Sequence, residues 1–387
     1  MSYHTAPVGV REPFAFTPVE LAALLKAEHA AGLPALLLST CNRCELYWTG
    51  EREAEAWFRD FGRSRGGDPD VALTRLDGLS AVRHLFTVAA GLDSQILGET
   101  EILGQVRRAF DQARAAGTTT REMDAIFSAA LAAGRRVRHE TLLGRHPASV
   151  SSAAVDVAAD RLGGVGGRTI VVLGAGEAAE GALRSLQERG PARVTLINRH
   201  TQRARTLAAA WGASTGEWTD LAAHLGEADV LLVATGAARP VILARQLAEA
   251  GSNRGGRSLI VMDLSVPRNV EPDARSLEGI ELFDLDDLQR LRCPAAGPLS
   301  ASLQEAERVL AEEIEHLEAG LRSRAAAPRL AELHRLGVEV AEQETAWVFD
   351  RLQDLTEGER EVVRAMADRL IRRVLYPMSR VIREDGR

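Results

Sequence analysis

The stretch Thr169-Ile170-Val171-Val172-Leu173-Gly174-Ala175-Gly176-Glu177-Ala178-Ala179 decides the fold of the central part of this 387-residue chain. Its first five residues predict a buried strand, and the pattern G-x-G-x-x-A follows it and opens a helical stretch. The first glycine permits a tight turn, the second lets backbone approach a pyrophosphate, and the small third residue permits close helix–strand packing. A helix N-terminus at this point presents amide donors to phosphate groups. Glycine-rich turns also occur without a ligand, but the position between strand and helix favours a dinucleotide site formed by Gly174, Ala175, Gly176, Glu177, Ala178 and Ala179.

The residues that follow extend the same pattern. Short aliphatic runs at 194–197, 230–233 and 259–262 alternate with helical stretches, which predicts a parallel, doubly wound sheet over residues 167–290. The run at 194–197 is followed by Asn198 and Arg199, with Arg203 one turn later. An acidic residue here would accept the ribose hydroxyls of NAD, whereas arginine suits the additional phosphate of NADP. These three residues favour NADPH over NADH; the alternative is a pair of solvated arginines after a strand.

The composition is that of an ordinary soluble protein with about two or three domains. The chain is 45% hydrophobic and 26% charged and carries a net charge of −7, with three cysteines. We see no apolar run near the roughly 18 residues of a membrane span and no secretory signal, so we expect a cytoplasmic location with no membrane contact. An odd, small number of cysteines does not predict a disulfide framework and fits a reducing compartment.

Two of the cysteines, Cys41 and Cys44, lie near a polar loop. The extended runs 36–38 and 46–48 flank Ser39-Thr40-Cys41-Asn42-Arg43, and reactive side chains are often placed on such loops. The spacing C-x-x-C is also typical of a zinc half-site or a redox pair, but zinc needs about two further ligands and Cys293 has no cysteine or histidine nearby. A cysteine packed in the core is the other alternative. The neighbouring Arg43 would lower the pKa of a thiol, which favours Cys41 as a nucleophile. A thiolate together with NADP indicates acyl reduction or aldehyde oxidation.

Helical stretches account for most of the remaining chain. In the N-terminal third we expect helices near 51–62, 79–90, 99–116 and 121–140, and an N-capped helix containing Ser151 and Ser152 that leads into the nucleotide domain. Several arginines in this third are either a local phosphate-binding surface or a solvated helix face: Arg107, Arg108, Arg114, Arg121, Arg135, Arg136, Arg138 and Arg145.

Residues 300–387 show no strand signal. An apolar stripe at helical spacing runs through Leu303, Ala306, Leu310, Ile314, Leu317 and Leu321. Helices of this kind do not easily bury their stripes alone. The tail therefore either dimerises or folds back on its own chain.

With these residues in view, the chain resembles the glutamyl-tRNA reductase family along almost its whole length. The strings that carry the resemblance in the N-terminal third are His4-Thr5-Ala6-Pro7-Val8, Arg11-Glu12, Ser39-Thr40-Cys41-Asn42-Arg43 with Glu45, Arg83-His84-Leu85-Phe86, Gly91-Leu92-Asp93-Ser94, Gly98-Glu99 and 102–106. Those in the nucleotide domain are Gly174-Ala175-Gly176-Glu177, Asn198-Arg199, Ala234-Thr235-Gly236 and Asp263-Leu264-Ser265-Val266-Pro267-Arg268. The tail, with Leu375-Tyr376-Pro377, matches more loosely.

The resemblance implies a reaction. Cys41 would attack the ester carbonyl of glutamyl-tRNA(Glu) and form a glutamyl thioester, which NADPH would reduce to glutamate-1-semialdehyde for tetrapyrrole synthesis. It implies a glutamate pocket lined by Thr40, Asn42, Arg43, Ser94, Glu99, Thr100, Glu101 and Gln105. Arg43 is suited to hold a carboxylate through two parallel hydrogen bonds, and Glu99 to pair with the substrate ammonium. His84 matches a position important for activity; it is either a proton-transfer group or a structural histidine.

The resemblance also implies an architecture: an N-terminal α+β catalytic domain (1–145), a linker helix (146–166), a Rossmann-type NADPH-binding domain (167–292) and an all-helical dimerisation domain (293–387). It implies a homodimer that hands its product to glutamate-1-semialdehyde aminomutase. There are departures from the family pattern. The strand expected before His4 is nearly absent, Glu101 replaces a common glutamine, and Asn269 replaces a frequent aspartate. Cys44 falls at a variable position.

Two other functions remain open at this level. A different NADP enzyme, such as one resembling shikimate dehydrogenase, would explain the nucleotide domain but not the cysteine loop or the tail. A tRNA-binding or scaffold protein would keep its function without Cys41. A requirement for charged tRNA tests the first, and NADPH turnover tests the second.

Overall fold

A computed structural model of the chain describes residues 1–31, 34–50, 54–94, 99, 101–141, 143, 149–190, 192–252, 254–291 and 299–384. Thr100 and Cys293 lie outside these residues. The chain divides into two compact units, Met1–Leu310 and Ala311–Arg387. None of the helices in the described ranges is long and apolar enough to cross a membrane.

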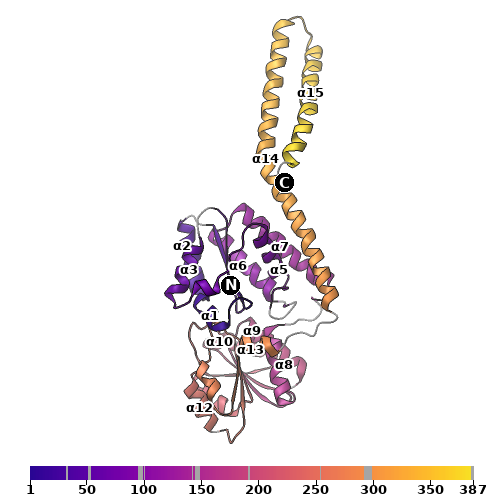
Figure 1. Cartoon of the computed structure of the whole chain (residues 1–387). Coiled ribbons are helices and arrows are strands. Elements are labelled where there is room, and N and C mark those ends of the chain that lie inside the picture. The colour runs from indigo at the N-terminus through magenta and orange to yellow at the C-terminus, as the bar shows by residue number, and fades with distance from the viewer. Residues whose placement is uncertain are drawn as a thin grey trace. The chain divides into compact units, whose positions relative to one another are not determined.

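The N-terminal part of the first unit combines a small sheet with helices (Figure 1). Strands β1 (Ala35–Ser39) and β2 (Cys44–Trp48) pair antiparallel, and Ser39 lies opposite Cys44. The helical segments are α1 (Val8–Arg11), η1 (Glu12–Phe14), α2 (Pro18–Ala31), α3 (Ala54–Ser64), α4 (Pro69–Ala72), α5 (Leu79–Ala89), α6 (Glu101–Ala116) and α7 (Arg121–Glu140). Helices α2 and α6 pack against β1, and α5 packs against α7. The described helices confirm the expected positions of α3, α5, α6 and α7, whereas α2 escaped prediction.

Residues 1–3 stand where the family pattern leads us to expect a strand. Ser2 forms an isolated antiparallel bridge with Arg43. The amide of Tyr3 donates to the carbonyl of Asn42 at 2.9 Å, and the amide of Cys44 donates to Met1 at 3.1 Å. The first residues therefore extend the edge of the hairpin that carries the cysteine loop.

Helix α8 (Val150–Leu162) leads into the nucleotide domain and contains Ser151 and Ser152, as predicted. Its N-cap is Ser149, whose hydroxyl accepts from the amide of Ser152 at 3.0 Å, while the amide of Ser149 donates to the Ser152 hydroxyl at 3.0 Å. This reciprocal pair satisfies two amides that the helix itself leaves without partners.

The nucleotide domain is a six-stranded parallel sheet in the order β5-β4-β3-β6-β7-β8. The strands are β3 (Thr169–Leu173), β4 (Arg193–Ile197), β5 (Ser214–Gly216), β6 (Val230–Val233), β7 (Leu259–Asp263) and β8 (Ile280–Phe283). The helical segments are α9 (Glu177–Arg189), α10 (Thr201–Trp211), η3 (Trp218–Asp220), α11 (Leu221–Glu227), α12 (Ala244–Ser252), η4 (Pro272–Ser276) and α13 (Leu285–Leu291). This is the doubly wound order of dinucleotide-binding folds, and the prediction of a parallel sheet is confirmed.

Both faces of this sheet are covered, which is why its strands read as continuous apolar runs. Along β3, Ile170 and Val172 join the core beneath α8, α9 and α10, whereas Val171 and Leu173 join the core beneath α11 and α12. The edge strands β5 and β8 escaped prediction. β5 has only three residues with no aliphatic side chain among them, and β8 has an acid inside it.

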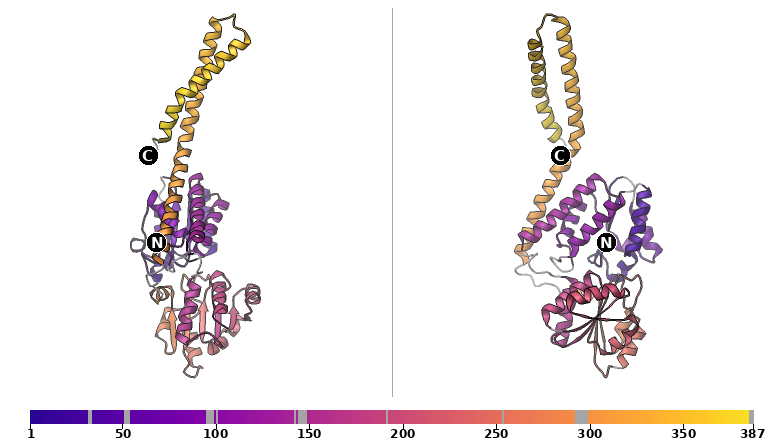
Figure 2. Two further views of the ribbon diagram at one scale, coloured as in Figure 1. Left: turned by 90° about the vertical axis from the view of Figure 1, so that its right-hand side faces the viewer. Right: turned by 180° about the vertical axis from the view of Figure 1, so that it is seen from behind.

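The second unit is a helical hairpin (Figures 1 and 2). Helix α14 (Leu299–Arg351) begins in the first unit and continues through the second, and α15 (Glu357–Glu384) folds back along it. A capping box starts α15, because the amide of Thr356 donates to Glu359 at 2.8 Å and the amide of Glu359 donates to the Thr356 hydroxyl at 3.3 Å. Gly337 faces α15 closely, since a Cβ there would lie 2.8 Å from Leu375.

The tail keeps a large apolar surface despite this folding back. In the predicted stripe, Ala306, Leu310, Ile314 and Leu317 are buried. Farther along the hairpin, large apolar side chains remain exposed: Leu336, Val338, Val340, Trp347, Leu352, Val362, Met366, Leu370, Val374, Tyr376, Met378 and Val381. An apolar surface of this size is typical of a protein interface.

Candidate functional site

The predicted nucleophile loop is the tight connection between β1 and β2. The amide of Thr40 donates to the carbonyl of Arg43 at 2.8 Å, and the Thr40 hydroxyl accepts from the amides of Asn42 and Arg43, each at 3.2 Å. These bonds leave Cys41 at the tip of the turn. Asn42 is buried, and its Oδ1 has no hydrogen-bond partner among the described residues.

Cys41 is half-buried and packs against the core of the nucleotide domain. Burial, followed by the negative charges of Glu99 and Glu101, raises the pKa of its thiol to about 12, whereas the charge of Arg11 lowers it. The cation among the main causes that act on this thiol is Arg11, whose Nη1 donates to the Cys41 carbonyl at 2.6 Å, and not the neighbouring Arg43.

Arg43 is engaged by the protein itself. Its Nη1 lies 2.9 Å from a Glu45 oxygen and 2.8 Å from an Asp93 oxygen, and its Nη2 donates to the Asp93 carbonyl. The side chain is 1% exposed. Both terminal nitrogens of this guanidinium are therefore taken by Asp93 and Glu45, and the buried Nε has no partner among the described residues. In the structure, Arg43 ties the nucleophile loop to the end of α5.

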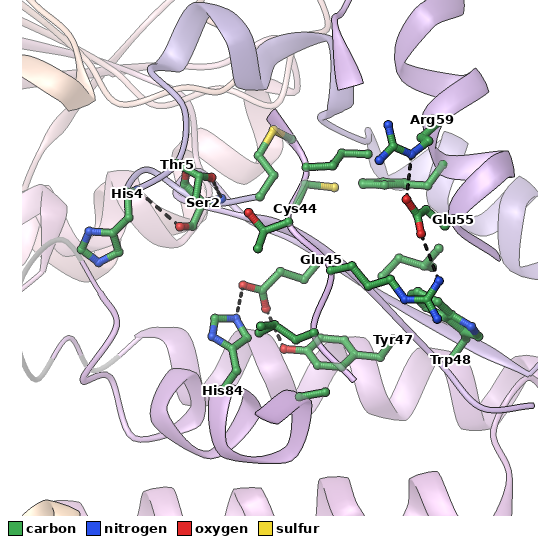
Figure 3. Close-up of a pocket in the computed structure, with 18 of the residues that line it drawn as sticks. Ser2, His4, Thr5, Cys44, Glu45, Tyr47, Trp48, Glu55, Arg59 and His84 are labelled. Atoms are coloured by element: carbon green, nitrogen blue, oxygen red, sulfur yellow. Dashed lines mark hydrogen bonds and ion pairs between the residues drawn. The ribbon is translucent and has the colours of Figure 1, made fainter. Parts of the chain in front are cut away.

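His84 belongs to the same polar network (Figure 3). Its Nε2 lies 2.7 Å from Oε1 of Glu45, and the hydroxyl of Tyr47 donates to Oε2 at 2.6 Å. Burial by itself would raise the pKa of Glu45, but the hydrogen bond from His84 and the charge of Arg43 hold that pKa at about 2. Glu45 is thus a buried carboxylate that orients the His84 ring.

A cavity of about 320 Å³ opens on this network and is lined by His84, Glu45, Tyr47, Cys44 and Asp93, among others. Figure 3 shows Cys44 and Glu45 on neighbouring positions of β2, with His84 rising from the helix opposite. Cys41 is not one of the lining residues. The structure therefore brings His84 together with Arg43 and Glu45, but gives no contact between His84 and Cys41.

The predicted acidic residues lie close enough to the nucleophile for their charges to act on its thiol. Ser94 and Glu99 are buried, and Arg138 donates to the carbonyl of Glu99 at 3.2 Å. Burial and the charge of Glu101 raise the pKa of Glu99 to about 7, while a hydrogen bond from Ser94 lowers it. Gln105 lies one turn after Glu101 on α6 and is half-buried.

Glu101 faces the nucleotide domain. A Cβ on Gly181 of α9 would lie 3.3 Å from Oε1 of Glu101. A second cavity, of about 250 Å³, is lined by Glu101, Arg108 and Glu177 among others, and Arg108 forms an ion pair with Glu177 at 2.6 Å. Glu101 of the predicted glutamate pocket and Glu177 of the predicted dinucleotide turn therefore line one cavity.

The dinucleotide turn has the geometry that the sequence predicts. Gly174 has a φ of 115°, and Gly176 is the N-cap of α9. A Cβ on Gly176 would meet open space. Ala179 is fully buried, and the carbonyl of Ala178 accepts from the Ser151 hydroxyl at 2.8 Å. Ala175 lies between the two glycines, and Glu177 opens the helix.

The residues after β4 lie at the same edge of the sheet. The side-chain amide of Asn198 donates to the carbonyl of His200 at 3.1 Å. Arg199 and Arg203 are exposed, and neither forms an ion pair with another described residue. Their charges are thus available to a phosphate.

Three contacts of the site were not predicted: the hydrogen bond from Arg11 to Cys41, the ion pair of Arg43 with Asp93, and the ion pair of Arg108 with Glu177. Arg11 and Asp93 stood within motifs already quoted from the sequence, but their partners lie 30 and 50 positions away. Some arginines of the predicted basic surface form ion pairs with acids, as Arg114 does with Asp124 and Arg136 with Glu140. Among the described residues, no group of three or more histidine, cysteine or acidic side chains could hold a metal.

Comparison with known proteins matches each part of the chain. Residues 1–141 match the family model of the glutamyl-tRNA(Glu) reductase N-terminal domain, residues 156–291 that of shikimate/quinate 5-dehydrogenase, and residues 305–387 that of the glutamyl-tRNA(Glu) reductase dimerisation domain.

Whole-length relatives carry the same name. Glutamyl-tRNA reductase of Chloroflexus aggregans is 34% identical over 99% of this chain and 89% of its own length. The glutamyl-tRNA reductase of Moorella thermoacetica is 35% identical over 97% of this chain and 87% of its own length. The solved glutamyl-tRNA reductase of Methanopyrus kandleri is 30% identical and covers 100% of this chain and 97% of its own, with a TM-score of 0.46. This chain therefore belongs to the glutamyl-tRNA reductase family.

Proposed function

We propose that this chain reduces glutamyl-tRNA(Glu) to glutamate-1-semialdehyde with NADPH, through a thioester on Cys41, at an early step of tetrapyrrole synthesis. The observation that carries the proposal is the position of Cys41. It stands at the tip of a tight turn and packs against the core of the nucleotide domain. The nucleophile and the dinucleotide fold are thus neighbours, as acyl transfer followed by hydride transfer requires.

The residues present fit NADPH. Gly176 leaves open space at the first turn of α9, a helix of 13 residues whose N-terminal amides suit a pyrophosphate. Gly174, Ala175, Glu177, Ala178 and Ala179 would complete this turn, while Arg199 and Arg203 would hold the ribose phosphate and Asn198 would shape their loop. When bound, NADPH supplies the hydride that reduces the thioester to the aldehyde.

Cys41 must become a thiolate before it attacks. Its pKa of about 12 leaves it protonated at neutral pH, mainly through burial and the charges of Glu99 and Glu101. We propose that the α-ammonium of the glutamyl group pairs with these carboxylates and removes their opposition to the thiolate. Substrate binding would then activate the nucleophile. Attack forms the carbon–sulfur bond and breaks the ester carbon–oxygen bond, and the departing ribose oxygen of the tRNA takes up the proton that the thiol gives up.

The other pocket residues have supporting roles in this proposal. Thr40 shapes the turn, and Asn42 offers its unpartnered buried Oδ1 to the substrate. Ser94 donates to Glu99, and Gln105 would line the glutamate pocket from α6. Thr100, which lies outside the described residues, belongs to the same proposed pocket. Arg43 holds the loop through Asp93 and Glu45. His84 acts in proton transfer, held in place by Glu45.

We also propose the domain division 1–145, 146–166, 167–292 and 293–387. The exposed apolar side chains of the hairpin, together with the match to a dimerisation domain, support a homodimer. A cytoplasmic location and transfer of the product to glutamate-1-semialdehyde aminomutase belong to the same proposal.

A single-turnover assay tests this function. Glutamyl-tRNA labelled in the glutamate is mixed with the full chain, with or without NADPH, and with Cys41→Ser and Cys44→Ser as matched variants. We expect label on the wild type and on Cys44→Ser without NADPH, its conversion to glutamate-1-semialdehyde with NADPH, and neither on Cys41→Ser. Absence of both tRNA-dependent labelling and NADPH oxidation in the wild type would leave the alternative of a different dehydrogenase.

A further inference from the structure

Arg11 and Glu12 are adjacent residues whose side chains contact two separate segments of the nucleotide domain. The proposed chemistry assigns neither of them a role. Arg11 ends α1 and Glu12 begins η1. Their partners are Asp286, in the first turn of α13, and Arg268, in the loop after β7. Each pair joins residues more than 250 positions apart in the chain.

Arg11 joins the nucleophile to this partner domain. Its Nη1 donates to the carbonyl of Cys41 at 2.6 Å, and its Nη2 donates to Oδ1 of Asp286 at 3.0 Å. The other oxygen of Asp286 accepts from the amide of Val8 at 2.7 Å. Arg11 is 2% exposed, so this link is shielded from solvent. One guanidinium thus fixes the backbone of the nucleophile relative to α13.

Arg11 also has a spare donor. Its Nε is buried and has no hydrogen-bond partner among the described residues. An unpartnered buried N–H is costly, and an anion forming nearby relieves that cost. The charge of Arg11 acts on the Cys41 thiol, so this guanidinium would stabilise a thiolate at Cys41.

Glu12 makes the second connection. Its Oε1 accepts from both the amide and the Nε of Arg268, each at 2.7 Å, and its Oε2 accepts from Nη2 at 3.0 Å. Two parallel hydrogen bonds between a carboxylate and a guanidinium fix orientation as well as distance. Gly9 allows the close approach, because a Cβ there would lie 3.2 Å from Nη2 of Arg268.

The loop that carries Arg268 is itself held rigidly. Asp263, at the end of β7, accepts from the amides of Ser265, Asn269 and Val270 at 3.1, 2.7 and 2.8 Å. The side-chain amide of Asn269 donates to the carbonyls of Ala237 and Pro267 at 3.0 and 3.1 Å. Arg268 is therefore presented to Glu12 from a fixed support.

We propose that Arg11–Asp286 and Glu12–Arg268 form a latch that holds the Cys41 loop on the nucleotide domain for the hydride step. Arg11 and Glu12 are positioning residues in this scheme, and the inference rests on the proposed function. Formation of the thioester depends on the Cys41 loop, whereas the hydride step also needs the thioester and the nicotinamide in register. The Glu12–Arg268 pair therefore serves the second half-reaction selectively, while Arg11 acts on the Cys41 thiol as well.

The test separates the two half-reactions in the full-length protein. Acyl-enzyme is first formed without NADPH, and NADPH is then added in a rapid-mixing experiment. We expect Arg268→Glu, which places a carboxylate against Glu12, to form acyl-enzyme within about twofold of the wild-type rate but to reduce it about tenfold more slowly or worse. The double variant Glu12→Arg/Arg268→Glu restores the pair in reverse and should recover a large part of the lost rate. Recovery is incomplete because an arginine at position 12 cannot accept from the backbone amide.

A control is the ion pair between Arg161 and Glu281, which joins α8 to β8 and does not involve the segment that carries Arg11 and Glu12. Arg161→Glu should leave the reduction rate unchanged. The Arg11–Asp286 pair has its own test. In Arg11→Gln, the pH at which Cys41 becomes reactive toward an alkylating reagent should rise, an effect that Arg268→Glu should not produce. Thermal melts and NADPH titrations confirm that each variant is folded.

Equal slowing of acylation and reduction, or reduction at the wild-type rate in Arg268→Glu, would overturn the latch. So would failure of the reversed pair to recover any rate. Failure of the wild type to form acyl-enzyme would instead contradict the proposed function itself.

Discussion

Gly174 and Gly176 stand two positions apart in the same turn, yet the structure gives them different roles. At Gly174, φ is 115°, and a Cβ would lie 2.0 Å from the carbonyl oxygen of Ala234 and 2.7 Å from its carbon. Both neighbouring atoms are backbone, so the end of β6 would have to move. At Gly176, φ is −101° and a Cβ would meet nothing within 4 Å. Gly174→Ala and Gly176→Ala therefore form a matched pair.

The expected magnitudes follow from these two environments. A side chain at an unfavourable positive φ costs about 1–3 kcal/mol, and the backbone collision adds to this. Gly174→Ala should therefore lower the free energy of unfolding by about 3 kcal/mol or more. Gly176→Ala should change it by less than about 1 kcal/mol, because alanine restricts the unfolded chain but is a poorer N-cap than glycine. The new methyl group would instead stand where a pyrophosphate approaches α9, and we expect NADPH affinity to fall about tenfold or more.

Urea denaturation followed by circular dichroism measures the first quantity, and fluorescence titration with NADPH measures the second. The reasoning requires the two variants to separate: one loses stability, and the other loses cofactor affinity while remaining folded. Wild-type stability in Gly174→Ala would show that β6 yields easily. Full NADPH affinity in Gly176→Ala would show that the pyrophosphate does not bind at this turn.

Three further predictions concern other parts of the site. Arg199→Asp should weaken NADPH binding about tenfold or more and leave NADH binding intact or improved, as measured by parallel titrations; an equal loss for both cofactors would contradict the phosphate role. Burial raises the pKa of Glu99 to about 7, so the folded protein holds this proton more tightly than the unfolded chain does. The stability that the protonated carboxyl contributes is full below about pH 4.5 and is lost as pH rises through 7. Glu99→Gln should flatten the decrease of the urea midpoint between pH 5 and 8. A variant with the wild-type pH profile would refute this role of Glu99. Asn269→Asp removes two donated hydrogen bonds and adds a charge beside Asp263. It should therefore lower the free energy of unfolding by about 2–4 kcal/mol. An unchanged urea midpoint would show that the loop rearranges freely.

Local patterns in the sequence predicted the elements and the turns of this protein. The apolar run 169–173 and the glycines after it predicted β3 and the start of α9, because strand burial and turn geometry depend on neighbouring residues. The polar loop with Cys41 between two extended runs was likewise predicted correctly. Short β5 and the acid-containing β8 were missed, since tertiary pairing rather than local pattern makes them strands.

The partners of the site residues could not be predicted in the same way. Arg43 was expected to face a substrate carboxylate, but it finds Asp93, which lies 50 positions later, beside it. Arg11 reaches Cys41 and Asp286 only after the N-terminal segment has packed on α13. A charged side chain in a sequence has many candidate partners, and only the assembled fold selects one of them. The structure also explains why asparagine stands at position 269 where the family pattern often has aspartate. The side-chain amide of Asn269 donates two hydrogen bonds that a carboxylate cannot make.

The buried environment of Cys41 has a consequence for how the protein survives oxidants. Peroxides attack thiolates rather than thiols, and the first product, a sulfenic acid, leads on to irreversible acids. With a pKa of about 12, Cys41 stays protonated between turnovers. Cys44, which is buried in the hairpin, has a pKa raised to about 12 as well, first of all by burial. A chain idle for lack of charged tRNA should therefore withstand peroxide, and its nucleophile should become vulnerable only when substrate is bound.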